Sequence, residues 1–285
     1  MIARVFSGGL EDFKKLNKDD QEHYRVLAVE HIAKECTENR KAAVVAGHYM
    51  FWEDDTQAAG HVVWTQGDLE TYTHILYLQV PAKIIALRRK NDMTRPRPAL
   101  CAEHLHKWQE VEDSQLRQLC REGGILYLPV TPQSALSARV AMLLRDFVDH
   151  NEEYNLACAK ERLDEMMTVT EAQPKTILVI DADKTLAAQD AGVLFFKKAM
   201  TSTILSEQSC SLKALFSSPL GYTYTAFRQA TLLFEEATND GEFEELCSEV
   251  AEEVSMHPEF VSLLHLVVQH DDVDVIVVSC GLRRV

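Results

Sequence analysis

Apolar and polar residues follow two patterns along the chain. Short runs rich in β-branched residues predict buried strands, and longer stretches with apolar residues at helical spacing predict amphipathic helices. The predicted strands are Ala42–Ala46, Ile75–Val80, Ile125–Val130, Thr176–Ile180 and Val273–Val278. Because strands that alternate with helices are typical of parallel sheets, we expect an α/β fold made of two doubly wound parallel-sheet units.

Helices are predicted between these strands. They cover Lys18–Glu38, the stretch from Pro81 into Arg88–Lys90, Cys101–Arg121, Ala135–His150 and Glu152–Met167. Asp19 is the expected N-cap of the first helix, and Pro81 suits the first turn of the second.

A polar segment, residues 168–174, follows the last of these helices and ends in Pro174. Polar residues followed by proline are typical of a connection between domains. We therefore expect one domain over residues 1–167, a linker at 168–174, and a second domain over residues 175–285.

The composition narrows the class of protein. Of the 285 residues, 46% are hydrophobic and 26% are charged, which is typical of a globular protein with a sizeable core. The formal net charge of −15 argues against broad electrostatic binding to nucleic acid or to an anionic membrane. Seven cysteines without a CxxC pair fit a reduced, intracellular chain. Since no segment approaches the ~20 apolar residues of a membrane span, we expect a cytoplasmic protein without nucleic-acid or membrane partners.

The strand Thr176–Ile180 leads into two carboxylates, Asp181 and Asp183. Ligands of open α/β proteins bind at the carboxyl edge of the sheet, and this pair suits phosphoryl transfer there. One carboxylate can attack phosphorus, and the other, when protonated, can donate to the leaving oxygen and later activate water. A hard cation such as Mg²⁺ would offset the repulsion between phosphate and carboxylates. A helix-capping turn with solvated acids explains such a pair, taken alone, equally well.

The longer string Ile177–Leu186, read as ILVIDADKTL, resembles motif I of the haloacid dehalogenase (HAD) superfamily. Downstream, VIVVSCG, which contains Ser279, resembles the second motif of that family. The resemblance implies a Rossmannoid fold and an aspartyl-phosphate mechanism with a small phosphorylated metabolite as substrate. It assigns the nucleophile to Asp181, the acid/base to Asp183, Mg²⁺ binding to both, and contacts with the substrate phosphate to Ser279, Thr185 and Gly281.

The segment between the two motifs, about residues 190–270, carries several helical patterns. Phosphoserine phosphatase-like members of the HAD superfamily have a helical cap at this place. We therefore expect a cap that covers the site and selects the substrate.

The family also uses a lysine and an acidic pair that follow later strands, and the chain ends at Val285 before them. We therefore expect a partial HAD-like unit with weak or no activity by itself. Its incomplete sheet would leave open strand edges, which favour self-association. The alternative is a non-catalytic interaction module or a truncated fragment.

The N-terminal part resembles small P-loop kinases of the nucleotide or gluconate kinase type. Ala42–Tyr49 is placed like their second core strand, and four arginines resemble their phosphate-facing lid residues: Arg88, Arg89, Arg95 and Arg97. A solvated helix end explains these arginines equally well. The Walker sequence GxxxxGK[ST] is absent from the chain, so we predict no ATP-dependent kinase activity.

The order of the two parts resembles a group of fungal multidomain proteins. In that group a P-loop kinase-like domain precedes a HAD-like domain and a uracil phosphoribosyltransferase-like domain. The resemblance implies that this chain is a truncated form, which covers the first domain and half of the second.

Overall fold

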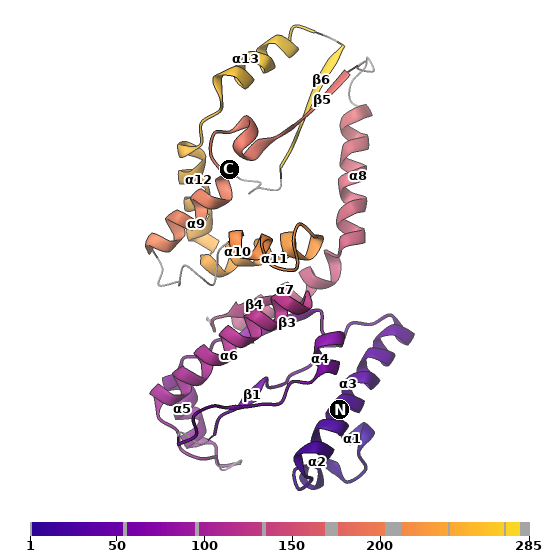
Figure 1. The fold of residues 1–285 in the computed structure, drawn as a ribbon, viewed down its shortest axis with the longest axis vertical. Helices are drawn as coiled ribbons and strands as arrows, with labels where there is room; N and C mark the ends of the chain where they lie inside the picture. Colours follow the sequence, from indigo (N-terminus) through magenta and orange to yellow (C-terminus); the bar gives the residue numbers. More distant parts are fainter. Residues whose placement is uncertain are drawn as a thin grey trace. The chain divides into compact units, whose positions relative to one another are not determined.

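The computed structural model describes residues 2–53, 56–94, 97–132, 135–168, 176–202, 212–238, 240–270 and 272–279 (Figure 1). The chain divides into two compact units, Met1–Leu144 and Arg145–Val285. Each unit combines helices with a small parallel sheet, so the predicted α/β class is confirmed. None of the described helices has the length and apolar character needed to cross a membrane.

The first unit contains two small sheets. Its elements are α1 (Ile2–Val5), α2 (Gly9–Phe13), α3 (Lys18–Asn39), β1 (Met50–Phe51), β2 (His61–Val62), α4 (Gln66–Thr71), β3 (His74–Leu78), α5 (Ala82–Asn91), α6 (Ala102–Gly123), β4 (Leu126–Val130) and most of α7 (Leu136–Asp149). Strands β1 and β2 pair antiparallel, and β3 and β4 pair parallel from His74↔Leu126 to Leu78↔Val130. Helices α5 and α6 lie between β3 and β4 in the sequence, so they form the crossover that a parallel pair needs.

The prediction of a strand at Ala42–Ala46 is wrong. Residues 41–48 form neither helix nor strand, and the Val44 side chain is 75% exposed. The strand begins later, at the buried Met50, which pairs with Val62. An apolar, β-branched run becomes a strand only where a sheet edge accepts its backbone hydrogen bonds, and no described strand pairs with residues 41–48.

Helix α6 covers the β3–β4 sheet through apolar and polar contacts. Its Leu116 and Cys120 pack in one buried cluster with Tyr127 of β4. The Tyr77 hydroxyl donates to Glu112 at 3.1 Å, and the Tyr127 hydroxyl donates to Asp113 at 2.5 Å. Burial raises the pKa of both tyrosines, and the neighbouring carboxylates raise it further. The buried phenols therefore stay protonated and act as hydrogen-bond donors.

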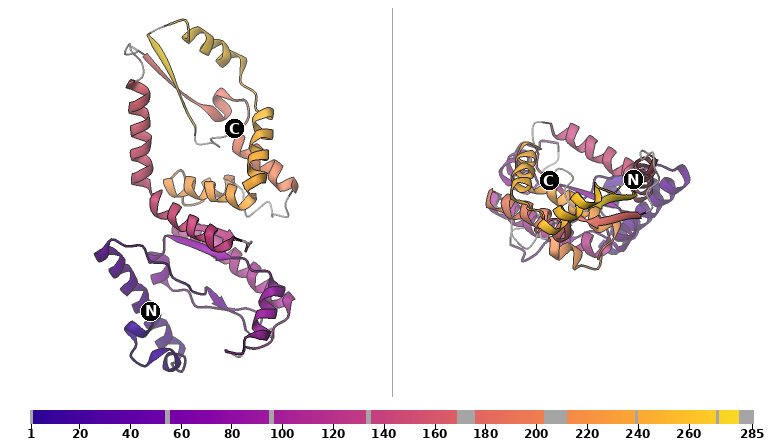
Figure 2. Two further views of the ribbon diagram at one scale, coloured as in Figure 1. Left: turned by 180° about the vertical axis from the view of Figure 1, so that it is seen from behind. Right: turned by 90° about the horizontal axis from the view of Figure 1, so that it is seen from above.

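In the second unit, a group of helices lies between two parallel strands in the sequence. Its elements are α8 (Glu152–Thr168), β5 (Thr176–Asp181), the π-helical turn η1 (Ala182–Leu186), α9 (Ala191–Ser202), α10 (Leu212–Phe216), α11 (Tyr224–Ala237), α12 (Asp240–Glu253), α13 (Pro258–Val267) and β6 (Val273–Val278). Strands β5 and β6, both predicted from the sequence, pair parallel from Thr176↔Val273 to Asp181↔Val278. Helix α13 contacts β6, which follows it in the chain (Figure 2).

Helices α9–α12, here called the helical insertion, have a hydrophobic core of their own. Phe195 of α9 is fully buried, and its ring contacts those of Phe196, Phe234 and Phe243 at centroid distances of 5.1–5.9 Å. Leu215 and other apolar residues of α10–α12 complete this core. The insertion thus has the packing of a small separate helical layer.

The predicted linker is not tested by the structure. Helix α8 ends at Thr168, and residues 169–174 lie outside the described part of the chain. The division between compact units falls earlier, at Leu144 and Arg145, so α8 is grouped with the second unit.

The aromatic core of the insertion leads to a stability prediction. Phe195→Ala should destabilise α9–α12 by about 3–5 kcal/mol, because it removes a fully buried ring and leaves a cavity. Val193→Ala on the same helix, where the side chain is 52% exposed, should cost no more than about 0.5 kcal/mol. The urea dependence of amide hydrogen exchange in α11 measures both changes. Equal effects of the two substitutions would contradict the packing described above.

Candidate active site

The carboxyl end of β5 brings the two predicted motifs together. Asp181 is the last residue of β5, and its neighbour in the parallel ladder is Val278 of β6. Ser279 follows Val278 directly, so the predicted nucleophile and the predicted phosphate ligand lie at the same edge of the sheet. Both residues are exposed at this edge, and a ligand from solvent can therefore reach them.

The turn after β5 brings the Thr185 side chain back to Asp181. In η1 the hydroxyl of Thr185 donates to Asp181 Oδ2 at 3.1 Å. This hydrogen bond fixes the orientation of the carboxylate while the residue itself stays exposed. A carboxylate held in this way is suited to act as an oriented nucleophile.

Asp183 has a different environment from Asp181. It is half-buried, and its Oδ1 accepts a hydrogen bond from the backbone N–H of Ala191 at 2.9 Å. Ala191 is the first residue of α9, and the first N–H groups of a helix have no partner within the helix. The carboxylate of the predicted acid/base is therefore oriented by the start of the helical insertion.

Lys184 and Asp190 form an ion pair next to these residues. The Lys184 Nζ lies 2.9 Å from Asp190 Oδ2, and Asp190 Oδ1 accepts from the N–H of Val193 at 3.0 Å. Partial burial acts to raise the pKa of Asp190, but hydrogen bonds from Lys184 and from backbone N–H groups outweigh it, so the pKa is lowered. The hydrogen bond to Asp190 raises the pKa of Lys184. Both groups are therefore charged at neutral pH.

The two ends of the segment that carries the insertion lie side by side next to this site. An antiparallel bridge between Ala187 and Met256 holds them together through two backbone hydrogen bonds, from the Ala188 N–H to the Ser255 carbonyl at 2.9 Å and from the His257 N–H to the Leu186 carbonyl at 3.1 Å. The side chain of Gln189 adds a third hydrogen bond, because its Oε1 accepts from the Ser255 N–H at 2.9 Å. The insertion is thus attached beside the carboxylates, where a cap over the site would be anchored.

The residues at this edge fit a hard divalent cation that also takes ligands from its substrate. Asp181 and Asp183 offer carboxylate oxygens, which Mg²⁺ prefers, and Mg²⁺ commonly takes one or two carboxylates together with water and phosphate oxygens. Within the described ranges, no group of three or more His, Cys, Asp or Glu residues could hold a metal alone. The donor set therefore fits Mg²⁺ bound together with a phosphorylated ligand.

Some site residues were predicted and others were not. Gly281 lies outside the described residues, so its predicted contact with phosphate stays a prediction. Asp190, Gln189 and Ser255 were not expected at the site. An aspartate just before an apolar helical run is an N-cap signal, which could have indicated Asp190. The contact between Gln189 and Ser255 joins distant parts of the chain, and no local pattern predicts it.

The candidate arginines of the first unit differ in environment. The side chain of Arg89 is only 7% exposed, and its guanidinium lies 3.6 Å from Glu53 Oε1 and donates to the Pro98 carbonyl at 3.2 Å. Arg88 and Arg97 are exposed, and Arg95 lies outside the described residues. Arg89 thus has structural partners, and the phosphate-facing assignment of the four arginines stays a prediction.

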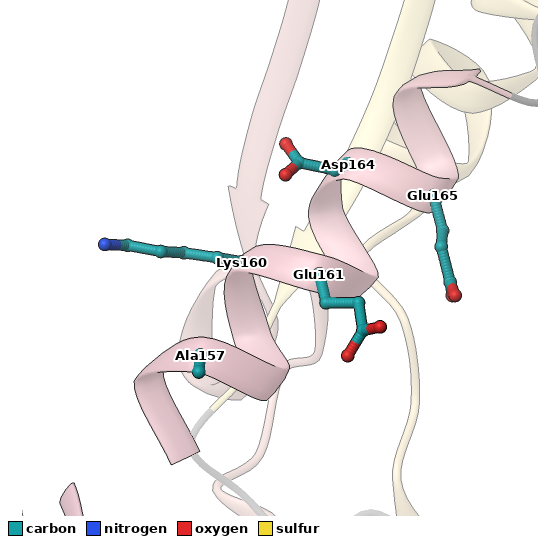
Figure 3. A pocket seen from close by; sticks show the side chains of 5 residues that line it. All are labelled: Ala157, Lys160, Glu161, Asp164 and Glu165. Atoms are coloured by element: carbon teal, nitrogen blue, oxygen red, sulfur yellow. The ribbon is translucent and has the colours of Figure 1, made fainter. Parts of the chain in front are cut away.

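A shallow hollow lies on the exposed surface of α8, away from the predicted site residues in the sequence (Figure 3). It is lined by Ala157, Lys160, Glu161, Asp164 and Glu165. These residues come from two turns of one exposed helix, and none of them belongs to the predicted site. The chemistry of the sheet edge, rather than this hollow, therefore defines the candidate site.

Comparison with known families agrees with the two-part organisation. A family model described as an AAA domain matches residues 1–106, and a model described as a haloacid dehalogenase-like hydrolase matches residues 178–285. No curated protein and no solved structure matches the chain. The first part of the chain is therefore similar to AAA-type, P-loop kinase-like domains and the second part to HAD-like hydrolase domains, and the second match includes Asp181, Asp183 and Ser279. The resemblance to fungal fusion proteins with a uracil phosphoribosyltransferase-like domain stays a prediction.

The buried position of Arg89 leads to a prediction for the first unit. Arg89→Ala should destabilise this unit by about 1–3 kcal/mol, because it removes a side chain that is only 7% exposed, together with its packing and its contacts to the Pro98 carbonyl and Glu53. Arg88→Ala, at the neighbouring exposed position, should change stability by no more than about 0.5 kcal/mol. Tryptophan fluorescence during urea unfolding reports on this unit, because Trp52, Trp64 and Trp108 all lie in it. A stability loss for Arg88→Ala as large as that for Arg89→Ala would contradict the assignment.

Proposed function

We propose that the chain contains a HAD-type phosphomonoester hydrolase site that works through an aspartyl-phosphate on Asp181. The observation that carries the proposal is the β5–β6 register, which places Asp181 and Ser279 at one exposed edge. The match of a HAD-like hydrolase model to residues 178–285 supports this reaction class.

In the first step, a carboxylate oxygen of Asp181 attacks phosphorus, and the bond from phosphorus to the substrate oxygen breaks. Asp183 gives a proton to the leaving oxygen, which departs as an alcohol. In the second step Asp183 takes a proton from water as that water attacks the phosphorus of the aspartyl-phosphate. Inorganic phosphate leaves, and the carboxylate of Asp181 is regenerated.

The surrounding residues orient these groups. The hydroxyl of Thr185 holds Asp181, and the N–H of Ala191 holds Asp183. We assign Ser279 the task of donating a hydrogen bond to an oxygen of the transferring phosphoryl group. Asp181 and Asp183 would hold Mg²⁺, which neutralises phosphate charge when it is bound.

The substrate class that we propose is a small phosphorylated metabolite. The helical insertion is attached next to the carboxylates at Ala187 and Met256, so it can close over a small ligand and exclude water. We also propose a cytoplasmic location, because the described cysteines Cys36, Cys101, Cys120, Cys158 and Cys247 are free.

A second candidate function is a non-catalytic interaction module that self-associates. It is favoured by the exposure of apolar residues on the β5–β6 pair, where Val179 is 66%, Val277 48% and Val278 52% exposed. An assembly that forms without any phosphatase activity in the full-length natural protein would favour this second function.

Substitution of the two carboxylates tests the proposed reaction. In the full-length natural protein, Asp181→Asn should abolish phosphomonoester hydrolysis, because an amide is a poor nucleophile. Asp183→Asn should lower kcat by about 10²–10⁴-fold, the usual contribution of a general acid/base. Release of inorganic phosphate measures both rates.

Asp164→Asn makes the same chemical change on the exposed surface of α8 and serves as the matched control. It should leave kcat unchanged. Hydrolysis at an unchanged rate by the Asp181→Asn protein would overturn the nucleophile assignment.

A further inference from the structure

Lys184 has an unusual backbone conformation for its position. Its φ is +58°, in the left-handed region that favours glycine. The other described non-glycine residue with positive φ is Arg40, which ends helix α3, where this conformation is common. Lys184 instead lies inside the turn η1, directly after Asp183. A glycine would adopt this conformation at lower cost, so the lysine side chain should provide a compensating interaction.

The contacts of Lys184 provide such an interaction. Its Nζ pairs with Asp190 Oδ2 at 2.9 Å, and its backbone N–H donates to the Gln189 carbonyl at 3.2 Å. Both partners belong to the short segment that leads into α9. Lys184 therefore holds this segment through its main chain and its side chain at once.

The neighbouring pair of residues completes the arrangement. Asp183, next to Lys184, accepts from the N–H of Ala191, which is next to Asp190. Two consecutive residues of the turn thus bind two consecutive residues at the start of α9. The position of Asp190 determines where the Ala191 N–H points, and that N–H orients the Asp183 carboxylate.

We propose that Lys184 is a positioning residue, which fixes the start of α9 through Asp190 and thereby orients the carboxylate of Asp183. The catalytic consequence of this assignment rests on the proposed function, whereas the structural role of Lys184 does not. Lys184 acts through Asp190 and Ala191 and does not contact the substrate. Loss of its ammonium group lets the start of α9 move, and Asp183 loses its fixed orientation for proton transfer.

The test compares variants of the full-length natural protein. Lys184→Asn removes the ammonium group but keeps a residue that tolerates the left-handed conformation. Lys184→Arg keeps the charge and should rescue the effect. Asp190→Asn removes the partner charge and keeps an N-cap side chain for α9. Lys198→Gln is the matched control, because Lys198 on α9 pairs with Glu249 and Glu253 instead.

The first readout is amide hydrogen exchange of Ala191, which needs no enzymatic activity. We expect Lys184→Asn and Asp190→Asn each to raise its exchange rate at least about threefold. A change of this size corresponds to the free energy that a partly exposed ion pair contributes. The double variant should exchange no faster than either single variant, because the two changes remove one interaction. Lys184→Arg and Lys198→Gln should exchange like the natural protein. Unchanged exchange in Lys184→Asn, or additive effects of the two substitutions, would overturn the proposal.

The second readout is kinetic and separates this inference from the proposed function. Lys184→Asn should lower kcat about tenfold with KM changed less than twofold, the signature of an interaction used in the transition state. A rise in KM with unchanged kcat would overturn the positioning assignment in favour of substrate contact. Absence of hydrolysis in the natural protein would refute the proposed function, and the exchange data would then decide the structural part alone.

Discussion

The candidate site depends on the parallel pairing of β5 with β6. Backbone hydrogen bonds along this pair set Asp181 beside Val278, and Ser279 therefore lies next to the predicted nucleophile, although the two are far apart in the sequence. A parallel pair needs a long crossover connection, and here the crossover carries the whole helical insertion. One element of backbone pairing thus assembles the carboxylates, the serine and the base of the insertion at the same edge.

The second unit derives its packing from the insertion more than from its sheet. The described strands β5 and β6 keep apolar residues exposed, with Val179 at 66%, whereas Phe195, Leu215 and Val250 of the insertion are fully buried. In the first unit the sheet itself is the centre, because every residue of β4 is buried under α6 and its neighbours. The buried aromatic core of the second unit therefore lies in the helical insertion, which is attached beside the site. Contacts such as Lys184–Asp190 can therefore transmit the position of that core to Asp183.

The sequence predicts much of this architecture and part of the site. Strands were predicted correctly where both a β-branched run and a pairing partner exist, as at Val273–Val278, although this strand is only partly buried. The run Ala42–Ala46 is also apolar, but only two of its five residues are β-branched and no described strand lies beside it. The carboxylates were predicted because they follow a strand directly. The hydrogen bond from Ala191 to Asp183 and the contact between Gln189 and Ser255 depend on the path of the chain around the insertion, which no local pattern encodes.

The central claim is that a phosphoryl group is transferred to Asp181, and chemical trapping of the intermediate tests it most directly. The full-length natural protein is mixed with Mg²⁺ and a phosphomonoester, quenched in acid and reduced with borohydride, which converts an aspartyl-phosphate into homoserine. Mass spectrometry of the peptides then locates the modified residue. The account predicts homoserine at position 181 and at no other aspartate. Turnover of the ester with an unmodified Asp181, or with homoserine at another position, would contradict it.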